Sequence, residues 1–230
     1  MPDITIKSLD GKEFGAYCAM PKGNNGAGLL VIQEIFGVNA AMRAICDDFA
    51  AKGYVAVCPD LFWRQEPGVQ ITDQTAAEWD RAFALYKAFD VEAGVRDLLA
   101  ALAHLRRMPG CNGKVGTVGY CLGGKLAYMM AARSDVDAAV GYYGVGLETM
   151  LDEVHDIRMP LMLHIAELDK FCAPDIRAKI LRGVARNPKI VAHTYPNADH
   201  AFARPNGQNY NEAAATLANQ RTADFLAWHL

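Results

Sequence analysis

A cysteine between two glycines is the first feature of this chain that could carry out chemistry. The stretch Gly119-Tyr120-Cys121-Leu122-Gly123 follows the predicted strand 114–118 and leads into the helical pattern 122–132. At a turn between a strand and a helix, small neighbours let the two elements approach closely and lift the central side chain above the sheet. The helix N-terminus favours a negative charge there, and the backbone N–H of Leu122 can stabilise an oxyanion. Cys121 is therefore the candidate nucleophile.

An acid and a histidine follow this cysteine in the order that a nucleophile, acid and base require around such a turn. Asp169 comes just after one apolar run and His200 just after another. Both therefore lie in loops at the carboxyl ends of strands, where parallel sheets carry their ligand sites. Glu167 and Asp199 compete for the acid role. We prefer Asp169, because Glu167 lies nearer the strand end and Asp199 adjoins the histidine in a tight loop.

The remaining composition narrows the choice of nucleophile and of partners. The 230 residues include six cysteines but two serines, Ser8 and Ser134, and neither serine lies at a turn between a strand and a helix. There is no C-x-x-C pair, no zinc-type spacing and no export signal, so we expect reduced thiols, no metal or other cofactor, and a cytoplasmic protein. A net charge of −3 and the lack of an 18-residue apolar run argue against nucleic-acid and membrane partners.

We expect a monomer with a single domain over residues 1–230. Four other histidines are expected at packing or surface positions: His104, His164, His193 and His229. His155 lies in a charged loop with no strand before it.

Short β-like runs alternate with longer helical patterns, which predicts a mostly parallel sheet with helices on both faces. Asp10-Gly11 predicts a hairpin between the first two runs. Together with the cysteine turn, this pattern favours an α/β-hydrolase fold with a twisted sheet of about eight strands. The expected strands are 4–9, 13–20, 28–33, 54–58, 114–118, 138–143, 161–165 and 190–195, and the expected helices are 39–52, 72–89, 90–107, 122–132, 174–185 and 210–229. Residues 59–72 are expected to form a surface loop.

The loop after the third predicted strand, Gln33–Gly37, is a second candidate site element. In such a fold this loop supplies the other oxyanion N–H, here expected from Ile35. Glu34 would then lie near Cys121, and a buried carboxylate is costly unless it is paired. Glu34 is therefore either a salt-bridge partner or a gate that shares a proton with the thiol and shifts when an anionic substrate arrives.

With these residues in place, the chain resembles the dienelactone hydrolase (carboxymethylenebutenolidase) family over nearly its whole length. The stretches that carry the resemblance are QEIFGVNAAMR, GYVAVCPDLFWRQEPG, KAFDVEAGVRDL, NGKVGTVGYCLGGKLA, AVGYYGVGLE and HAFAR. The resemblance implies cofactor-free hydrolysis of an anionic enol-lactone to a dicarboxylic acid, in the degradation of catechols and chlorocatechols. The roles that it implies are Cys121 as nucleophile, His200 as base, Asp169 as the residue that orients the base, Glu34 as gate, and the N–H groups of Ile35 and Leu122 as oxyanion hole.

The resemblance also implies two arginines that hold the substrate carboxylate. Arg204, in HAFAR, matches one of them. The other position falls on Trp79, so Arg81, two residues further on, can serve if the helix register shifts. The small polar residue that the family has after the histidine is Ala201 here. The aromatic side chains expected to line the pocket are Phe36, Phe83, Tyr86 and Tyr143.

Other functions also fit a thiol at this turn. A cysteine nucleophile suits activated esters and lactones, so a general carboxylesterase or thioesterase of the same fold is the first alternative, and it would prefer neutral esters. A redox-sensing thiol protein without ester turnover is the second, and a catalytically silent scaffold the third. A sensor needs no acid and histidine in this order, which is why we favour a hydrolase.

Overall fold

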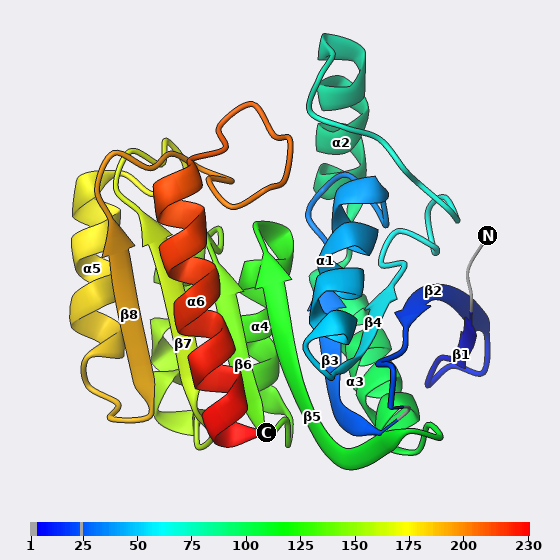
Figure 1. The fold of residues 1–230 in the computed structure, drawn as a ribbon. Coiled ribbons are helices and arrows are strands. Elements are labelled where there is room, and N and C mark those ends of the chain that lie inside the picture. The colour runs from blue at the N-terminus through cyan, green and yellow to red at the C-terminus, as the bar shows by residue number, and fades with distance from the viewer. Residues whose placement is uncertain (1–3, 24) are drawn as a thin grey trace. The chain divides into compact units, whose positions relative to one another are not determined.

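The loops that the sequence singles out follow strands of one mixed sheet. In the computed structural model, which describes residues 4–23 and 25–230, eight strands follow the order β1-β2-β4-β3-β5-β6-β7-β8 (Figure 1). The chain divides into two units, one up to Gly116 and one from Thr117 onwards. The long strand β5, Cys111–Tyr120, contributes residues to both units. The predicted α/β-hydrolase fold, a mostly parallel sheet with helices on both sides, is confirmed.

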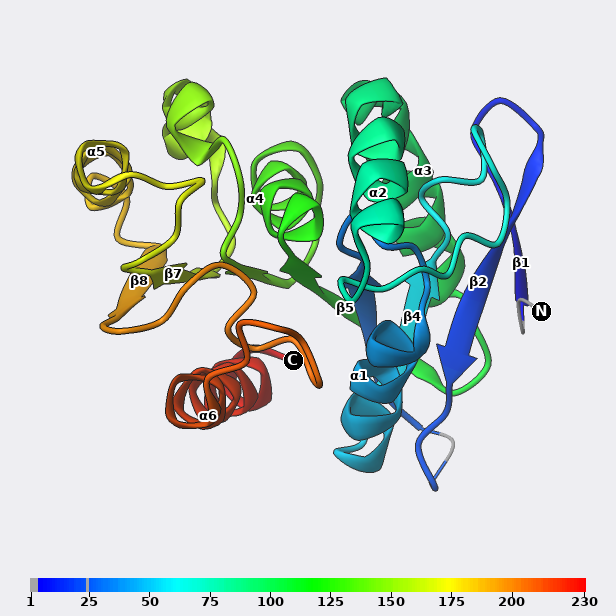
Figure 2. The same ribbon diagram turned by 90° about the horizontal axis from the view of Figure 1, so that it is seen from above.

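The first unit begins with a hairpin and continues with alternating strands and helices. Strand β2 pairs antiparallel with both β1 and β4, whereas β3 and β4 are parallel. Helix α1 covers one face of these strands and α3 covers the other (Figure 2). The elements are β1 Ile4–Lys7, β2 Glu13–Ala19, β3 Gly26–Ile32, α1 Ala40–Ala51, β4 Val55–Pro59, α2 Ala76–Ala88 and α3 Val91–Arg106.

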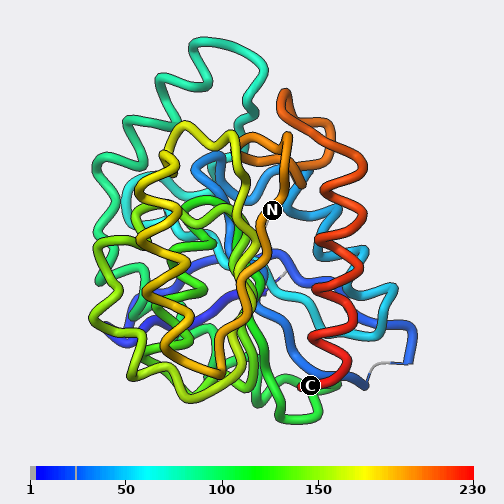
Figure 3. Tube along the Cα trace, turned by 90° about the vertical axis from the view of Figure 1, so that its left-hand side faces the viewer, coloured from blue at the N-terminus to red at the C-terminus, as the bar shows by residue number. Residues whose placement is uncertain are grey.

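The second unit is a parallel arrangement whose strands lead directly into the candidate site loops. Strand β7 pairs with β6 on one side and β8 on the other. Helices α4 and α5 lie on one face of these strands and α6 on the other (Figure 2), and Figure 3 shows β8 between α5 and α6. The elements are α4 Leu122–Arg133, β6 Ala138–Tyr142, β7 Leu161–Ala166, α5 Pro174–Val184, β8 Ile190–Tyr195 and α6 Glu212–His229.

Four helices begin at a polar side chain that accepts a hydrogen bond from the first turn. The capping residues are Asn39 for α1, Thr75 for α2, Asp90 for α3 and Asn211 for α6. Thr75 also reaches Glu78 three residues later, which is the reciprocal pairing of a capping box. Helix α4 differs, because no side chain caps its start at Cys121.

The expected elements are all present, and their ends differ in a few places. Helix α2 starts at Ala76 rather than residue 72, because Thr75 forms its cap. Strand β5 is longer than the expected 114–118. Its first residues were not expected in the strand because they lack the apolar pattern of a buried strand. Two short 3₁₀ helices, Leu147–Thr149 and Leu151–Asp156, lie where no element was expected. In residues 4–23 and 25–230, no helix has both the length and the apolar character that a membrane crossing requires.

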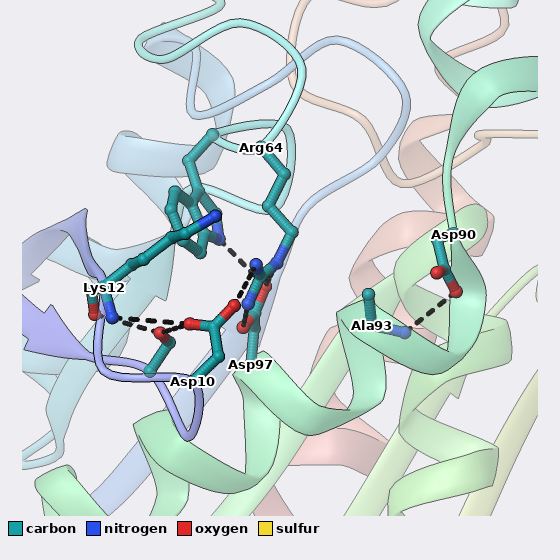
Figure 4. A network of polar contacts seen from close by, with 8 residues as sticks. Asp10, Lys12, Arg64, Asp90, Ala93 and Asp97 are labelled. Carbon is teal, nitrogen blue, oxygen red and sulfur yellow. Dashed lines mark hydrogen bonds and ion pairs between the residues drawn. The ribbon is translucent and has the colours of Figure 1, made fainter.

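A buried carboxylate ties the loop after β4 to α3. Asp97, on α3, is 1% exposed. Its oxygens accept hydrogen bonds from Trp63 Nε1 at 2.8 Å and from Arg64 Nε and Nη2 at 2.9 and 2.7 Å. Arg64 also reaches Asp10 in the hairpin between β1 and β2 (Figure 4). One arginine therefore connects three segments of the first unit.

Replacing Asp97 with alanine is expected to destabilise the protein by about 2–4 kcal/mol, because three hydrogen bonds to a charged partner are lost and the donors on Trp63 and Arg64 are left without this acceptor. Urea unfolding measures the loss. Asp10→Ala is the matched control: it removes the exposed partner of the same arginine, and the unfolding midpoint should move far less. Equal losses in the two variants would show that the buried contact to Asp97 is not the stabilising one.

Candidate active site

Cys121 occupies a strained backbone conformation at the start of α4. Its φ is 55° and its ψ is −113°, a region that residues with a side chain rarely adopt. The backbone N–H of Cys121 donates to Tyr142 O at 3.1 Å, which holds the turn against the end of β6. A Cβ on Gly119 would lie 1.9 Å from Gly123 O, and one on Gly124 would lie 2.5 Å from Tyr142 O. The two glycines therefore let the strand, the turn and the helix approach this closely.

The uncapped start of α4 leaves backbone donors beside the thiol. Helix N–H groups of the first turn have no partner within the helix. Leu122 is the first residue of α4, and no side chain caps this helix. The partial positive charge of a helix N-terminus favours an anion at this place. The arrangement can thus stabilise negative charge on Sγ and on an oxygen bound next to it.

Asp169 and His200 form a buried pair in the loops after β7 and β8. Asp169 Oδ2 lies 2.7 Å from His200 Nδ1, and the two residues are 5% and 4% exposed. The other carboxylate oxygen, Oδ1, accepts the Phe171 N–H at 2.8 Å. The second ring nitrogen of His200, Nε2, is buried and has no hydrogen-bond partner among the residues that the structure describes. The charge of Cys121 acts on this ring, so the thiol and the imidazole lie near each other.

The charges around His200 keep its ring protonated at neutral pH. Burial alone would lower the pKa of His200. The negative charge of Cys121 and the hydrogen bond to Asp169 outweigh burial and raise the pKa of His200 to about 10. An imidazolium between a carboxylate and a sulfur is the arrangement that cysteine hydrolases use to keep a thiolate ready for attack.

The two rival acids occupy other places. Asp199 Oδ1 accepts the backbone N–H of His200 at 2.6 Å, so this carboxylate supports the loop rather than the ring. The backbone oxygen of Glu167 accepts a hydrogen bond from Arg177 Nη1 at 2.6 Å. Asp169 is the acid that reaches the imidazole.

Comparisons with known proteins show what the chain is similar to. The family model described as "Dienelactone hydrolase family" matches residues 14–230. A relative from Azospirillum brasilense is 52% identical over the whole of both chains. The carboxymethylenebutenolidase of Pseudomonas putida is 46% identical, with 97% of this chain and 95% of that protein covered. A crystal structure of a protein from Klebsiella pneumoniae has a TM-score of 0.84 at 26% identity and covers 97% of this chain and 96% of that one.

This chain belongs to the dienelactone hydrolase family. It is accordingly a hydrolase, and the nucleophile, acid and histidine positions expected from the resemblance lie together in its second unit.

Two aromatic rings lie next to His200, and the sequence predicted only one of them as a pocket residue. Tyr143, an expected pocket residue, has its ring centroid 5.2 Å from that of His200, and its φ is 39°. The ring centroid of Phe171 lies 4.8 Å from that of His200, and this neighbour was not expected from the sequence. Its position two residues after Asp169 was the available signal, because its N–H bonds to that carboxylate. Both rings pack edge-on against the imidazole.

Arg204, which matches one family arginine, lies in the loop after β8 and is 7% exposed. Its backbone N–H donates to Ala201 O at 3.0 Å. Ala201, which replaces the small polar residue of the family, has a φ of 64°. The loop therefore makes a tight turn directly after His200 and places a buried cation four residues from it.

The other expected site residues belong to the first unit. Glu34 and Ile35 follow β3 and are 3% and 5% exposed. Phe36 is also buried, and its ring packs edge-on against Trp79 with centroids 5.0 Å apart. Tyr86, an expected pocket residue near the end of α2, is 36% exposed.

Helix α2 carries both candidates for the second arginine position. Trp79 faces Phe36 and Phe83, whose ring stacks on it at 5.4 Å. Arg81 lies on an exposed part of the helix and pairs with Glu66. The two side chains thus point to different surroundings, as a spacing of two residues on a helix requires.

No cluster of three or more histidine, cysteine, aspartate or glutamate side chains suited to a metal ion occurs in the described part of the chain. None of the six cysteines, all of which are described, forms a disulfide.

Proposed function

We propose that this hydrolase uses Cys121 to open an anionic enol-lactone of the dienelactone type and release a dicarboxylic acid, in the degradation of catechol-type aromatic compounds. The observation that carries the proposal is the Asp169–His200 pair beside Cys121 at the uncapped start of α4. The relatives named carboxymethylenebutenolidase support the lactone as substrate. The proposed setting is the cytoplasm, where a catalytic thiol stays reduced.

The first half of the reaction forms a thioester. The Sγ thiolate of Cys121 attacks the lactone carbonyl carbon, and the carbonyl oxygen becomes an oxyanion. The N–H of Leu122 and, as the family resemblance implies, the N–H of Ile35 stabilise it; one such donor contributes about 3–4 kcal/mol in related chemistry. The ring C–O bond then breaks and the enolate oxygen leaves. Conjugation stabilises that enolate, so the leaving group needs little help from an acid.

The second half of the reaction needs a base, and acylation of the sulfur provides it. The thioester sulfur carries no negative charge, so one cause of the raised pKa of His200 disappears. Burial, the largest influence on this pKa, lowers it, and fewer groups now counteract burial, so the pKa of His200 falls. His200 gives up its proton to the departing enolate or to solvent. It can then take a proton from the water that attacks the thioester carbonyl, while Asp169 holds the ring in place.

The charge of the substrate is the basis for assigning Arg204 to its carboxylate. A buried guanidinium next to the histidine loop is suited to a carboxylate, which it can bind with two parallel hydrogen bonds. Glu34 is proposed as the gate that shifts when the anionic substrate arrives, and Phe36, Tyr86 and Tyr143 as pocket residues. Arg81 joins the anion site in this proposal if it leaves Glu66.

The test compares kcat/KM for cis- and trans-dienelactone with that for a neutral p-nitrophenyl ester. The wild type should prefer a lactone. Arg204→Met should lower kcat/KM for the lactone by about 10- to 100-fold, the value of a hydrogen bond between charged groups, and change the neutral ester by less than about threefold.

Arg186→Met, at an exposed arginine of the same unit, is the matched control and should leave both substrates unaffected. A wild type that prefers the neutral ester would replace the proposal with a general carboxylesterase or thioesterase. Peroxide-reactive Cys121 without any ester turnover would point to a redox-sensing protein instead.

A further inference from the structure

A second polar cluster lies behind the candidate site, where α6 packs against β6, β7 and β8. His164 is at its centre and is 0% exposed. His164 Nδ1 lies 2.6 Å from Tyr195 Oη, and His164 Nε2 lies 2.9 Å from Thr222 Oγ1. Thr222 Oγ1 also lies 2.6 Å from Tyr142 Oη. Three adjacent strands thus each contribute one ring to a cluster that a threonine of α6 completes.

The protons of this cluster can be placed one after another. Tyr142 Oη donates to Asn219 Oδ1 at 3.0 Å, so its one proton is used there. The hydroxyl of Thr222 must therefore donate to Tyr142. Since Thr222 has then given its proton, it accepts one from His164 Nε2.

The directions of the remaining hydrogen bonds follow from the charge state of His164. Burial, together with the nearby His193 and Arg221, holds the pKa of His164 well below its usual range, so the ring is neutral and carries a single proton. That proton is at Nε2, which leaves Nδ1 as an acceptor for Tyr195. Tyr195 Oη in turn accepts from Arg221 Nη1 at 3.2 Å. The hydrogen bonds therefore run in one direction, from Arg221 through Tyr195, His164, Thr222 and Tyr142 to Asn219.

The same residues hold the loops of the candidate triad. Tyr142 O accepts the backbone N–H of Cys121 at 3.1 Å, and the Tyr142 ring stacks on that of Tyr120 at 4.8 Å. Tyr195 O accepts the N–H of Glu167 at 3.1 Å, at the point where the chain turns towards Asp169. His164 O accepts the Tyr143 N–H at 2.7 Å.

The loop of His200 also rests on this cluster. The ring of Phe202 lies 4.9 Å from that of Tyr195 and 6.5 Å from that of Tyr142. Phe202 is 0% exposed. A shift of either tyrosine would therefore move the loop that carries the imidazole.

We propose that His164 and Thr222 are positioning residues, whose one-way chain of hydrogen bonds sets the ends of β6, β7 and β8 so that Cys121 and His200 meet. This inference rests on the proposed function, because it concerns the same triad. Neither residue touches the reacting atoms. Displacements of about 1 Å at a reacting pair can cost ~100-fold in rate, so a cluster that fixes three strand ends can have a large effect on turnover.

Thr222→Val tests the inference, because valine keeps the shape of threonine and removes the hydroxyl. The expected result is a kcat for lactone hydrolysis at least tenfold lower at a KM within about twofold of the wild type. Thr222→Ser, which restores the hydroxyl, should recover most of the activity. Tyr195→Phe interrupts the chain at a second point and should act in the same direction if the valine variant folds poorly.

The alkylation rate of Cys121 by iodoacetamide at pH 6, followed by peptide mass spectrometry, gives a readout that needs no substrate. We expect it to fall at least tenfold in Thr222→Val, since the thiol loses its aligned imidazolium, and to recover in Thr222→Ser. The variants at residue 222 leave the charged groups around both histidines unchanged. Asp169 and Cys121 still act on His200, and His193 and Arg221 still face His164.

The outcomes separate this inference from the proposed function. A wild type without lactone hydrolysis would contradict the proposed function, and the alkylation rates would still decide on the positioning role. Unchanged kcat and alkylation in Thr222→Val, with a lower unfolding midpoint, would show that the cluster stabilises the fold and positions nothing.

Discussion

Cys121→Ala is expected to lower kcat for lactone hydrolysis by about 10⁴- to 10⁶-fold, the range found when a nucleophile is removed from a triad that acts as a unit. Alanine keeps the turn, because the backbone N–H to Tyr142 is unaffected. It removes the atom that forms the thioester and the negative charge that raises the pKa of His200. The remaining rate reports the backbone donors at the start of α4. Steady-state and single-turnover kinetics measure the loss.

Cys172→Ala is the matched control for the nucleophile. Cys172 is another buried cysteine close to Asp169, but burial and the nearby carboxylates raise its pKa to about 11, so it is a neutral thiol at neutral pH. Its replacement should change kcat by less than about threefold. A large loss of kcat in Cys172→Ala, together with turnover in Cys121→Ala, would show that the nucleophile is Cys172 and not Cys121.

The chain order of the site could be predicted because it follows from topology. Loops after parallel strands gather at one edge of the sheet, so a residue just after β7 and one just after β8 become neighbours. The 2.7 Å contact between Asp169 and His200 is the result. The choice among Asp169, Glu167 and Asp199 was harder, since it depends on where each side chain leaves a short loop. Cys121 was visible because glycines on both sides reveal a close approach of backbone segments.

The cluster around His164 could not be predicted from the sequence. His164 was expected at a packing or surface position, and its burial agrees with packing. Its polar partners Tyr195 and Thr222 are 31 and 58 residues away along the chain, so no local pattern links them. The 3₁₀ segments after β6 were missed for a different reason. They are short, and short segments carry too little periodicity to be recognised.

Asp169→Asn is expected to lower kcat by about 10²- to 10⁴-fold, although the side chain keeps its size. One oxygen must still accept the Phe171 N–H, which turns the new amide nitrogen towards His200 Nδ1. Two donors would then face each other, and the ring would avoid this by carrying its proton on Nε2. Nε2 is the atom that must take a proton from water in the second half of the reaction. The substitution therefore removes the base without removing the histidine.

The same substitution should lower the pKa of His200, since the bond to Asp169 is one of the causes that raise it to about 10 and burial is opposed to protonation. NMR titration of labelled histidine measures the shift in the protein without substrate. In the wild type, the raised pKa adds stability that is fully present below the usual histidine value of 6.5 and is lost as the pH rises through about 10. This contribution should shrink in Asp169→Asn.

Asp199→Asn is the control, because its side chain can still accept the backbone N–H of His200. It should leave both kcat and the titration close to those of the wild type. If Asp199→Asn rather than Asp169→Asn moved the titration, the acid of the triad would be Asp199, and the base would be held from its own loop.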